Sequence, residues 1–134
     1  MKYVTEHYPL EKATPDSAGY DLYYIGKPWT LEPGEIFKAR TGIYIHPESP
    51  VLLLGRSSLG AKYGVTLANS VGLIDMDYRG EIIVALINLG WDDYELHGGD
   101  RIAQLLPFVD DGVERVEVLD DTLRGAGGFG STGR

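Results

Sequence analysis

The stretch VTLANSVGLIDMDYRGEIIVALINLG, residues 65–90, places apolar runs on either side of a segment rich in turn-forming and charged residues. Asn69 and Gly72 favour tight turns, so they predict a hairpin around positions 69–75. Residues 82–87 are apolar at every position, which predicts a strand buried on both faces. In a small sheet protein, such a strand indicates a subunit interface as well as a core.

The rest of the chain repeats this pattern of short apolar runs between turn residues. Its 134 residues include 18 Gly and 7 Pro along the whole length, which is typical of an all-β sandwich or barrel. Further strands are predicted at residues 22–25, 36–45, 51–54, 101–108 and 116–118. We expect one short helix, in SSLGAKYG after Arg56, with Ser57 or Ser58 capping its start and Gly64 ending it in the left-handed conformation.

Composition limits the possible function classes. A content of 43% hydrophobic and 24% charged residues is typical of a soluble globular protein, and the length suits one domain. The absence of cysteine excludes disulfides, thiolate metal sites and a cysteine nucleophile. The net charge of -8 argues against duplex nucleic acid as a partner. No apolar run has the length of a membrane span and no signal peptide is evident, so a cytoplasmic location is the default.

The C-terminal segment LRGAGGFGSTGR is too rich in glycine for regular structure. It divides the chain into a β domain, residues 1–122, and a flexible arm, residues 123–134. Three arm glycines match the G-x-G-x-x-G fingerprint, but no helix can follow them, so we exclude a dinucleotide site. We interpret the arm as a phosphate-binding segment whose glycine N–H groups face an anion, with a disordered, solvated tail as the alternative. Its side chains that would bind a nucleotide are Arg124, Phe129, Ser131 and Thr132.

Two internal segments also have the residue types of a phosphate-handling site. GRSSLG, residues 55–60, opens the predicted helix, and Arg56, Ser57 and Ser58 would add donors to its free N–H groups. An ordinary helix start with a surface arginine is the alternative. GLIDMDYRGE, residues 72–81, contains two acids two positions apart, one of which would serve as a general base unless both belong to a solvated turn. The three histidines are scattered and predict no metal site.

Taken together and in this order, these segments resemble the five sequence motifs of the trimeric dUTPase family, over nearly the whole chain. The matching segments are AGYDL (18–22), GRSSLG (55–60), NSVGLIDMDYRGE (69–81), GDRIAQLL (99–106) and RGAGGFGSTG (124–133). The resemblance implies an all-β, barrel-like β-clip fold with one short helix, built as a homotrimer. It also implies shared active sites, a C-terminal arm exchanged between subunits, and hydrolysis of dUTP to dUMP and pyrophosphate.

The resemblance also implies a role for each site residue. Asn69 and the backbone near Gly72 and Ile74 would form a uracil pocket that rejects cytosine by mismatched hydrogen bonds. Tyr78 would pack under the deoxyribose and exclude a 2′-hydroxyl. Asp75 would activate the water that attacks the α-phosphorus.

The phosphates would be held by a second set of residues, given by the same resemblance. Arg56, Ser57 and Gln104 would bind them, with Ser57 near the α,β-bridging oxygen. The arm would close over the β- and γ-phosphates through Arg124, Gly128, Ser131 and Thr132, while Phe129 stacks on the uracil. Mg²⁺ would be held mainly by phosphates and water. Asp21 would then contact a metal-bound water or the arm's arginine.

Two residues of the second motif depart from the commonest family pattern. Gly55 stands where Pro is frequent, and Ser58 where Gly is frequent. The wording GRSSL also occurs in dCTP deaminases, a sister group on the same fold. The catalytic Glu of that group would fall at Ala85 here, so this alternative lacks its general acid–base. A non-catalytic nucleotide-binding regulator is disfavoured because the proposed base, the phosphate-binding arginine and the arm are all present.

Overall fold

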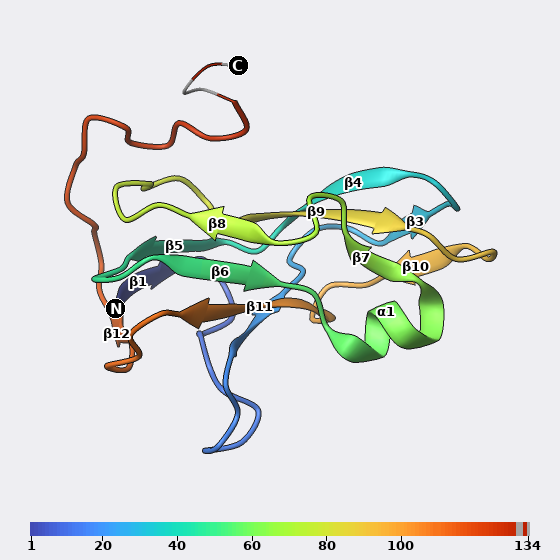
Figure 1. Ribbon diagram of the computed structural model, residues 1–134, viewed down its shortest axis with the longest axis horizontal. Helices are drawn as coiled ribbons and strands as arrows, with labels where there is room; N and C mark the ends of the chain where they lie inside the picture. Colours follow the sequence, from blue (N-terminus) through green and yellow to red (C-terminus); the bar gives the residue numbers. More distant parts are fainter. Residues whose placement is uncertain (131–132, 134) are drawn as a thin grey trace.

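The computed structural model describes residues 1–130 and 133, so the predicted site residues Ser131 and Thr132 lie outside the described part. Figure 1 shows strands throughout the chain and one short helix. In chain order the elements are β1 (Lys2–Thr5), β2 (Tyr20–Tyr23), β3 (Trp29–Leu31), β4 (Ile36–Arg40), β5 (Ile43–His46), β6 (Val51–Leu54), α1 (Ser57–Tyr63), β7 (Val65–Leu67), β8 (Gly72–Ile74), β9 (Ile83–Asn88), β10 (Tyr94–Leu96), β11 (Arg101–Pro107) and β12 (Glu114–Arg115). The prediction of an all-β fold with one short helix is therefore confirmed for these residues.

The strands form four small sheets around one apolar core. Their orders are β12-β1-β5, β10-β3, β2-β11-β6-β8 and β4-β9-β7. Each pair of neighbouring strands is antiparallel except β1 and β12, which are parallel. The core takes alternate residues from most strands. Its fully buried side chains include Leu22, Leu31, Ile45, Leu86, Leu96, Ile102 and Leu105. The predicted strands 51–54 and 101–108 are confirmed as β6 and β11, whereas β2 begins two residues before the predicted position 22.

The helix α1 ends as predicted but begins differently. Its N-cap is Arg56 in an extended conformation, and no side chain caps the first turn. The prediction that Ser57 or Ser58 caps the helix is therefore wrong. Gly64 ends it with φ 72° and ψ 14°, the left-handed conformation. A Cβ at Gly64 would lie 2.6 Å from the backbone nitrogen of Gly90, so the close approach of these two segments requires glycine.

The chain between β7 and β8 makes a turn but no hairpin ladder. β7 pairs with β9, whereas β8 pairs with β6, so the predicted hairpin at 69–75 is wrong. The N–H of Ser70 donates to the Leu67 carbonyl over 3.1 Å, and Ser70 has a φ of 62°. This turn moves the chain from one sheet to another. Turn-forming residues predict the reversal, but the choice of partner strand depends on the whole fold.

Two strands predicted in the second half of the chain, at residues 82–87 and 116–118, differ from the structure. β9 alternates along its length, with Val84 and Leu86 buried and Ile83 and Ala85 half-buried, so the single chain does not bury both faces fully. The predicted strand at 116–118 is wrong, because the last strand is β12 and Val118 is 81% exposed. Beyond β12 the chain leaves the sheet and runs toward the arm (Figure 1). An alternating pattern of residue types does not make a strand unless a neighbouring strand is there to pair with it.

The arm contains neither helix nor strand at residues 123–130, as its glycine content predicts. No helix among residues 1–130 and 133 is long and apolar enough to cross a membrane. A cytoplasmic location stays a prediction.

Candidate active site

A pocket of about 220 Å³ lies between β8, the loop that follows it, the start of β9 and the arm. Eight of the site residues predicted from sequence line it together. These are Asn69, Gly72, Ile74, Asp75, Tyr78, Arg124, Gly128 and Phe129. The first five come from one continuous segment, whereas the last three come from a segment some fifty positions later in the chain. The fold therefore brings the third and fifth motifs to the same place.

Asp75 occupies the first position after β8, on the rim of the pocket. Its side chain is 53% exposed and forms an ion pair with the guanidinium of Arg124. The same Nη1 atom lies 3.7 Å from Oδ1 of Asp77, whose side chain is 59% exposed. Arg124 is only 21% exposed, so its cation is enclosed by the two carboxylates and the neighbouring ring of Tyr78. The arm's cation thus pairs with the acid expected to act as base.

Tyr78 forms one wall of the pocket and is held at both ends. Its hydroxyl donates to the Glu81 carbonyl over 2.7 Å, and the Arg124 guanidinium carbon lies 5.6 Å from the ring centroid. Burial raises the pKa of the Tyr78 phenol, which keeps it a hydrogen-bond donor at neutral pH. A Cβ on Gly80 would lie 2.4 Å from the Tyr78 hydroxyl, so glycine is required under the ring.

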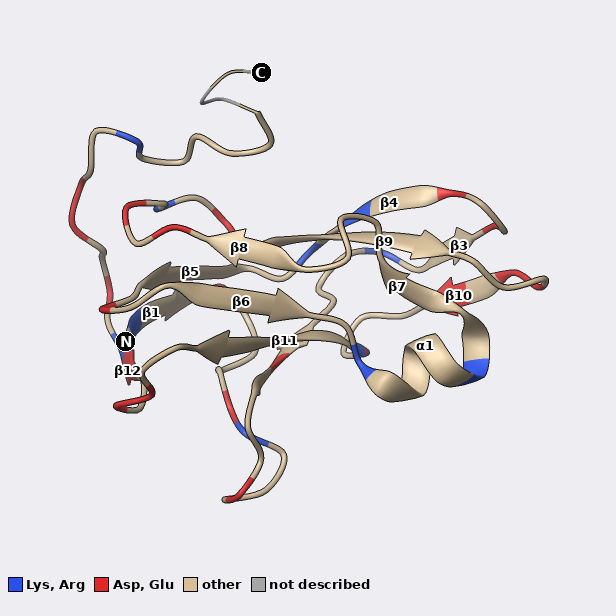
Figure 2. Cartoon of the chain, viewed as in Figure 1, with Lys and Arg blue, Asp and Glu red and all other residues tan. Residues whose placement is uncertain are grey.

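The base of the arm is tied to the loop after β8. The Nε atom of Arg79 lies 3.1 Å from Asp120, which also pairs with Nδ1 of His46 at 2.8 Å. The Thr122 hydroxyl donates to the Asp77 carbonyl over 2.5 Å. Figure 2 shows the resulting path, with the arm running above this loop and with acidic residues on both segments. The arm therefore starts from a defined position beside the pocket.

The tip of the described arm lies against the pocket itself. The backbone N–H of Arg79 donates to the Gly125 carbonyl over 2.5 Å. Gly128 packs so closely on Tyr78 that an added Cβ would lie 3.3 Å from the ring. The ammonium of Lys38, on β4, lies 4.6 Å from the centroid of the Phe129 ring, a cation–π contact. In this single chain the arm covers its own pocket.

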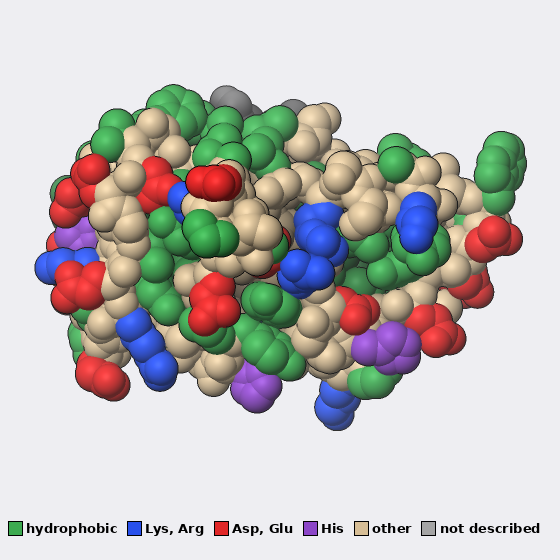
Figure 3. Space-filling view, turned by 90° about the horizontal axis from the view of Figure 1, so that it is seen from below, with side chains coloured by type: hydrophobic (Ala, Val, Ile, Leu, Met, Phe, Trp, Pro, Cys, Tyr) green, Lys and Arg blue, Asp and Glu red, His purple; other side chains and the backbone are tan. Residues whose placement is uncertain are grey.

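Three other predicted residues, Asp21, Arg56 and Gln104, form a second group together with Arg101, and we call these four residues the phosphate cluster. Asp21 is buried and accepts from Nη1 of Arg101 at 3.3 Å. Arg56 donates to the Arg101 carbonyl at 3.1 Å, and Gln104 donates to the Gly55 carbonyl at 3.2 Å. Ser57 and Ser58 are exposed at the adjoining start of α1. Figure 3, which views the β11 and α1 side of the molecule, shows basic side chains gathered beside acidic and apolar ones.

Asp75, on the rim of the pocket, and Arg56, in the phosphate cluster, lie at opposite ends of the same sheet. Ile74 pairs with Val51, so Asp75 lies level with residue 50, whereas Gln104 pairs with Leu54 at the far end of β6. Five or six residues of strand, at about 3.3 Å each, separate the level of Asp75 from that of Arg56, or roughly 17–20 Å. Within one chain, the two groups of predicted residues do not form one site.

Several residues that line or support the site were missed by reasoning from sequence. Leu53, Ile82, Ile83 and Glu81 also line the pocket. Lys38 contacts Phe129 and Arg101 pairs with Asp21, although neither was singled out. Glu81 and Arg101 stand inside matched motifs, which was a usable signal. Nothing in the sequence around Lys38 marks it, because its contact depends on how the arm folds back.

Comparison with known proteins gives the family directly. A family model described as dUTPase matches residues 7–133. The chain belongs to the dUTPase family. Deoxyuridine 5'-triphosphate nucleotidohydrolase from Hahella chejuensis is 49% identical over 127 residues, which cover 90% of this chain and 84% of that protein. The protein of the same name from Aeromonas hydrophila is 46% identical over 134 residues, covering 95% and 88%.

Solved structures of the dUTPase family share the fold. The crystal structure of dUTPase from Streptococcus mutans matches with a TM-score of 0.69 at 30% identity, over 84% of this chain and 100% of that chain. After the third motif, the strand β9 carries Ala85 opposite Lys38 of β4. A methyl group cannot exchange protons, so the strand offers no acid–base group at the position where the deaminase alternative needs one.

Proposed function

We propose that this dUTPase hydrolyses dUTP to dUMP and pyrophosphate, with the uracil and deoxyribose bound in the pocket beside β8. The observation that carries the proposal is the convergence of the third and fifth motifs on one pocket. Membership of the family and relatives named for the same reaction support it.

The pocket recognises the base and sugar by shape and hydrogen bonding. Asn69 and the backbone from Gly72 to Ile74 present polar groups to the uracil edge, and a cytosine leaves a buried donor facing a donor. Tyr78 packs under the deoxyribose. Because its ring is fixed through its hydroxyl, it cannot move aside for a 2′-hydroxyl. The phenyl ring of Phe129 covers the base from the arm side.

Asp75 acts as the general base for the attacking water. One of its oxygens binds Arg124 in the described chain. The phosphates of the substrate compete for that arginine, and their binding frees the carboxylate to orient a water and accept its proton. The water oxygen forms a bond to the α-phosphorus, while the bond from this phosphorus to the α,β-bridging oxygen breaks. Pyrophosphate leaves, and the proton resides on Asp75 before it passes to solvent.

The phosphate cluster reaches this pocket from a neighbouring copy in a homotrimer. The arm, which lies on its own pocket in the single chain, is exchanged in the assembly and makes the equivalent contacts on the pocket of another copy, so the fifth motif meets the third motif in both arrangements. Within one chain, Arg56 lies too far along the sheet from Asp75 to contact the same nucleotide at its α-phosphate, because the α-phosphorus is only a few bonds from the sugar. This distance supports a site built from two copies. Arg56, Ser57 and Gln104 of the adjacent copy hold the phosphates, with the arm's Arg124, Gly128, Ser131 and Thr132 over their outer end. Each complete site then needs more than one chain.

Mg²⁺ fits this site only as an ion held mainly by phosphate oxygens and water. No three His, Asp or Glu side chains of residues 1–130 and 133 converge on a possible metal site. Asp21 is the one carboxylate in the phosphate cluster, and Arg101 already binds one of its oxygens. Asp21 therefore suits a metal-bound water better than the ion itself. When bound, the ion offsets triphosphate charge.

The decisive experiment measures pyrophosphate release from dUTP, dCTP, dTTP and UTP with Mg²⁺, together with the native mass. We expect turnover of dUTP, hardly any turnover of the other three nucleotides, and an assembly of about 44 kDa, three times the 14.7 kDa chain. Release of ammonia from dCTP would support the deaminase alternative instead. Tight dUTP binding without turnover would indicate a regulator.

A further inference from the structure

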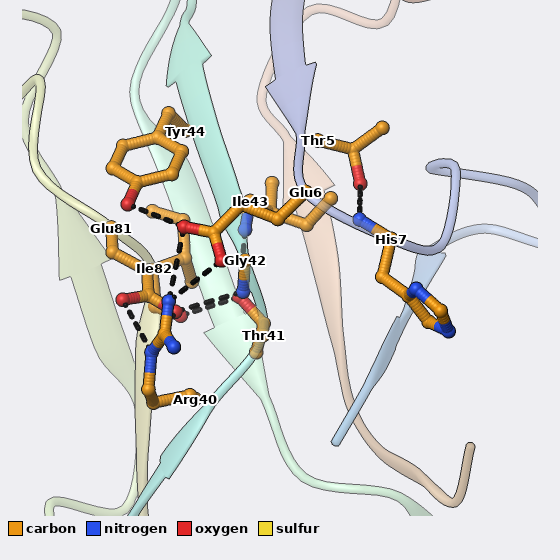
Figure 4. A network of polar contacts seen from close by, with 10 residues as sticks. All are labelled: Thr5, Glu6, His7, Arg40, Thr41, Gly42, Ile43, Tyr44, Glu81 and Ile82. Atoms are coloured by element: carbon orange, nitrogen blue, oxygen red, sulfur yellow. Dashed lines mark hydrogen bonds and ion pairs between the residues drawn. The ribbon is translucent and has the colours of Figure 1, made fainter. Parts of the chain in front are cut away.

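A network of four side chains includes Glu81, one of the residues that line the pocket (Figure 4). Arg40, at the end of β4, donates through Nε to both oxygens of Glu81 at 3.1 Å. Its Nη2 donates to Glu6 at 2.8 and 3.0 Å. The Tyr44 hydroxyl donates to the same Glu6 carboxylate at 2.9 Å. Arg40 therefore bridges two carboxylates that come from distant parts of the chain.

The network ends on a residue that lines the pocket. Glu81 is 15% exposed in its side chain, and its Oε1 also accepts from the backbone N–H of Gly42 at 2.8 Å. Its carbonyl accepts the Tyr78 hydroxyl at 2.7 Å. The side chain of Glu81 is thus held from the sheet, while its main chain holds the ring that forms a wall of the pocket.

The main chain that follows Glu81 is anchored to the sheet, so the network acts on the short segment before it, residues 78–81. The N–H of Ile82 donates to the Ile43 carbonyl at 2.7 Å, and the Thr41 hydroxyl donates to the Ile82 carbonyl at 2.6 Å. Residues 78–81 have no such strand pairing. Within this segment, Arg79 is held by Asp120 and by the Gly125 carbonyl, which belong to the C-terminal part of the chain. On the side of the sheet the segment is held by the Glu81 carboxylate, whose one charged partner among the described residues is Arg40.

The charged groups of the network favour each other's ionised forms. The hydrogen bond from Tyr44, together with Arg40, lowers the pKa of Glu6, and the hydrogen bonds to Glu81 and Glu6 raise the pKa of Arg40. Glu6 and Arg40 are therefore both ionised at neutral pH. A single exposed pair contributes little, but Arg40 is shared by two carboxylates and one of them is largely covered, so removing it leaves Glu81 with only a backbone donor.

We propose that Arg40 is a positioning residue for sugar discrimination: it fixes Glu81 and, through the Glu81 carbonyl, the ring of Tyr78. This inference rests on the proposed role of Tyr78 against the 2′-hydroxyl. Arg40 contacts no part of the substrate. Its loss lets residues 78–81 relax, which loosens the fit around deoxyribose and admits ribose.

The test compares kcat/KM for dUTP and UTP in the wild type, in Arg40→Met and in Arg40→Lys. We expect the dUTP/UTP ratio to fall about 5- to 20-fold in Arg40→Met, through a higher KM for dUTP and faster use of UTP. Arg40→Lys keeps the charge but cannot bridge both carboxylates, so its ratio should be intermediate. Arg115→Met is the matched control, since Arg115 lies on β12 without an ion pair among the described residues, and its ratio should not change.

The dependence of the dUTP/UTP ratio on salt concentration is a second test, because a purely structural role of Arg40 would leave this ratio independent of salt. Both substrates carry the same triphosphate, so the effect of salt on phosphate binding cancels in the ratio. Raising KCl from about 50 to about 500 mM should lower the wild-type ratio toward that of Arg40→Met and leave the variant almost unchanged. Tyr44→Phe, which removes one hydroxyl, should shift the ratio in the same direction by a smaller factor.

Three outcomes would overturn the inference. If folded Arg40→Met has the same dUTP/UTP ratio of kcat/KM as the wild type, the network does not act on Tyr78. A lower melting temperature with unchanged ratios in both Arg40→Met and Tyr44→Phe shows a purely structural role. A wild type that turns over UTP as well as dUTP removes the assigned role of Tyr78 together with this inference, which separates that failure from the first two.

Discussion

Asp75 and Arg124 form an ion pair that joins the pocket loop to the C-terminal arm. The acid proposed to activate water and the arginine proposed to hold phosphate are therefore each other's partners in the described chain. Asp77 lies beside the same guanidinium, at 3.7 Å, with nearly the same exposure. Two neighbouring carboxylates thus share one cation, yet only one of them lines the pocket.

Asp75→Asn should fold, bind dUTP and lose about 10²- to 10⁴-fold in the rate of hydrolysis, because an amide cannot accept the proton of the attacking water. Single-turnover kinetics at saturating dUTP measure this loss. Asp77→Asn is the matched control and should change the rate by less than about threefold. An undiminished rate in Asp75→Asn, or equal losses in both variants, would exclude Asp75 as the base.

Removal of every residue after Leu123 should leave the assembly intact and cripple hydrolysis. The β domain holds the apolar core, whereas the arm contributes the pocket residues Arg124, Gly128 and Phe129. Light scattering reports the assembly, and pyrophosphate release reports the activity. Dissociation of the truncated protein into monomers would show that the arm is structural instead.

Two inactive variants should restore activity when they are mixed in one assembly. Asp75→Asn damages the pocket, and Arg56→Ala damages the phosphate cluster at the other end of the sheet. If each site combines a pocket from one copy with a cluster from the next, about one site in four is intact in a random one-to-one mixture after refolding. Activity is expected near a quarter of the wild-type value.

The control for this experiment mixes each variant with itself through the same refolding step. Sites built within a single chain would leave the one-to-one mixture as inactive as the two controls, and that result would refute sharing between copies.

The folded chain should lose stability in acid through Asp110, which binds two residues of the N-terminal part of the chain. This carboxylate accepts from Lys12 at 2.6 Å and from Tyr20 at 2.8 Å, and the Lys12 hydrogen bond is the main cause that lowers the pKa of Asp110 to about 2 from 3.8. The unfolded chain then binds more protons between these values, so this contribution is complete above about pH 4 and is lost as the pH falls toward 2. Urea midpoints measured from pH 5 to pH 2 should fall more steeply for the wild type than for Asp110→Asn. Equal slopes would show that Asp110 is not linked to folding.

The strand content and the single helix were predictable from local patterns, but strand partners were not. Residues 69–75 contain turn formers, so the reversal between β7 and β8 was foreseen, yet β7 pairs with β9 and β8 with β6. A two-residue periodicity states which side chains face the core; it does not state which other strand completes the hydrogen bonds. The same limit explains the failed strand at 116–118, whose alternation has no ladder to join.

The sequence alone determined one continuous set of pocket residues. Asn69, Gly72, Ile74, Asp75 and Tyr78 lie within ten positions, so chain connectivity keeps them together. Tertiary structure alone decided the rest. It brought Arg124 to Asp75 from 49 positions away and Arg40 to Glu81 from 41 positions away. It also separated the phosphate cluster from the pocket along one sheet. The physical reason is that contacts across strands depend on register and on the path of the arm, and no local pattern of residues encodes either.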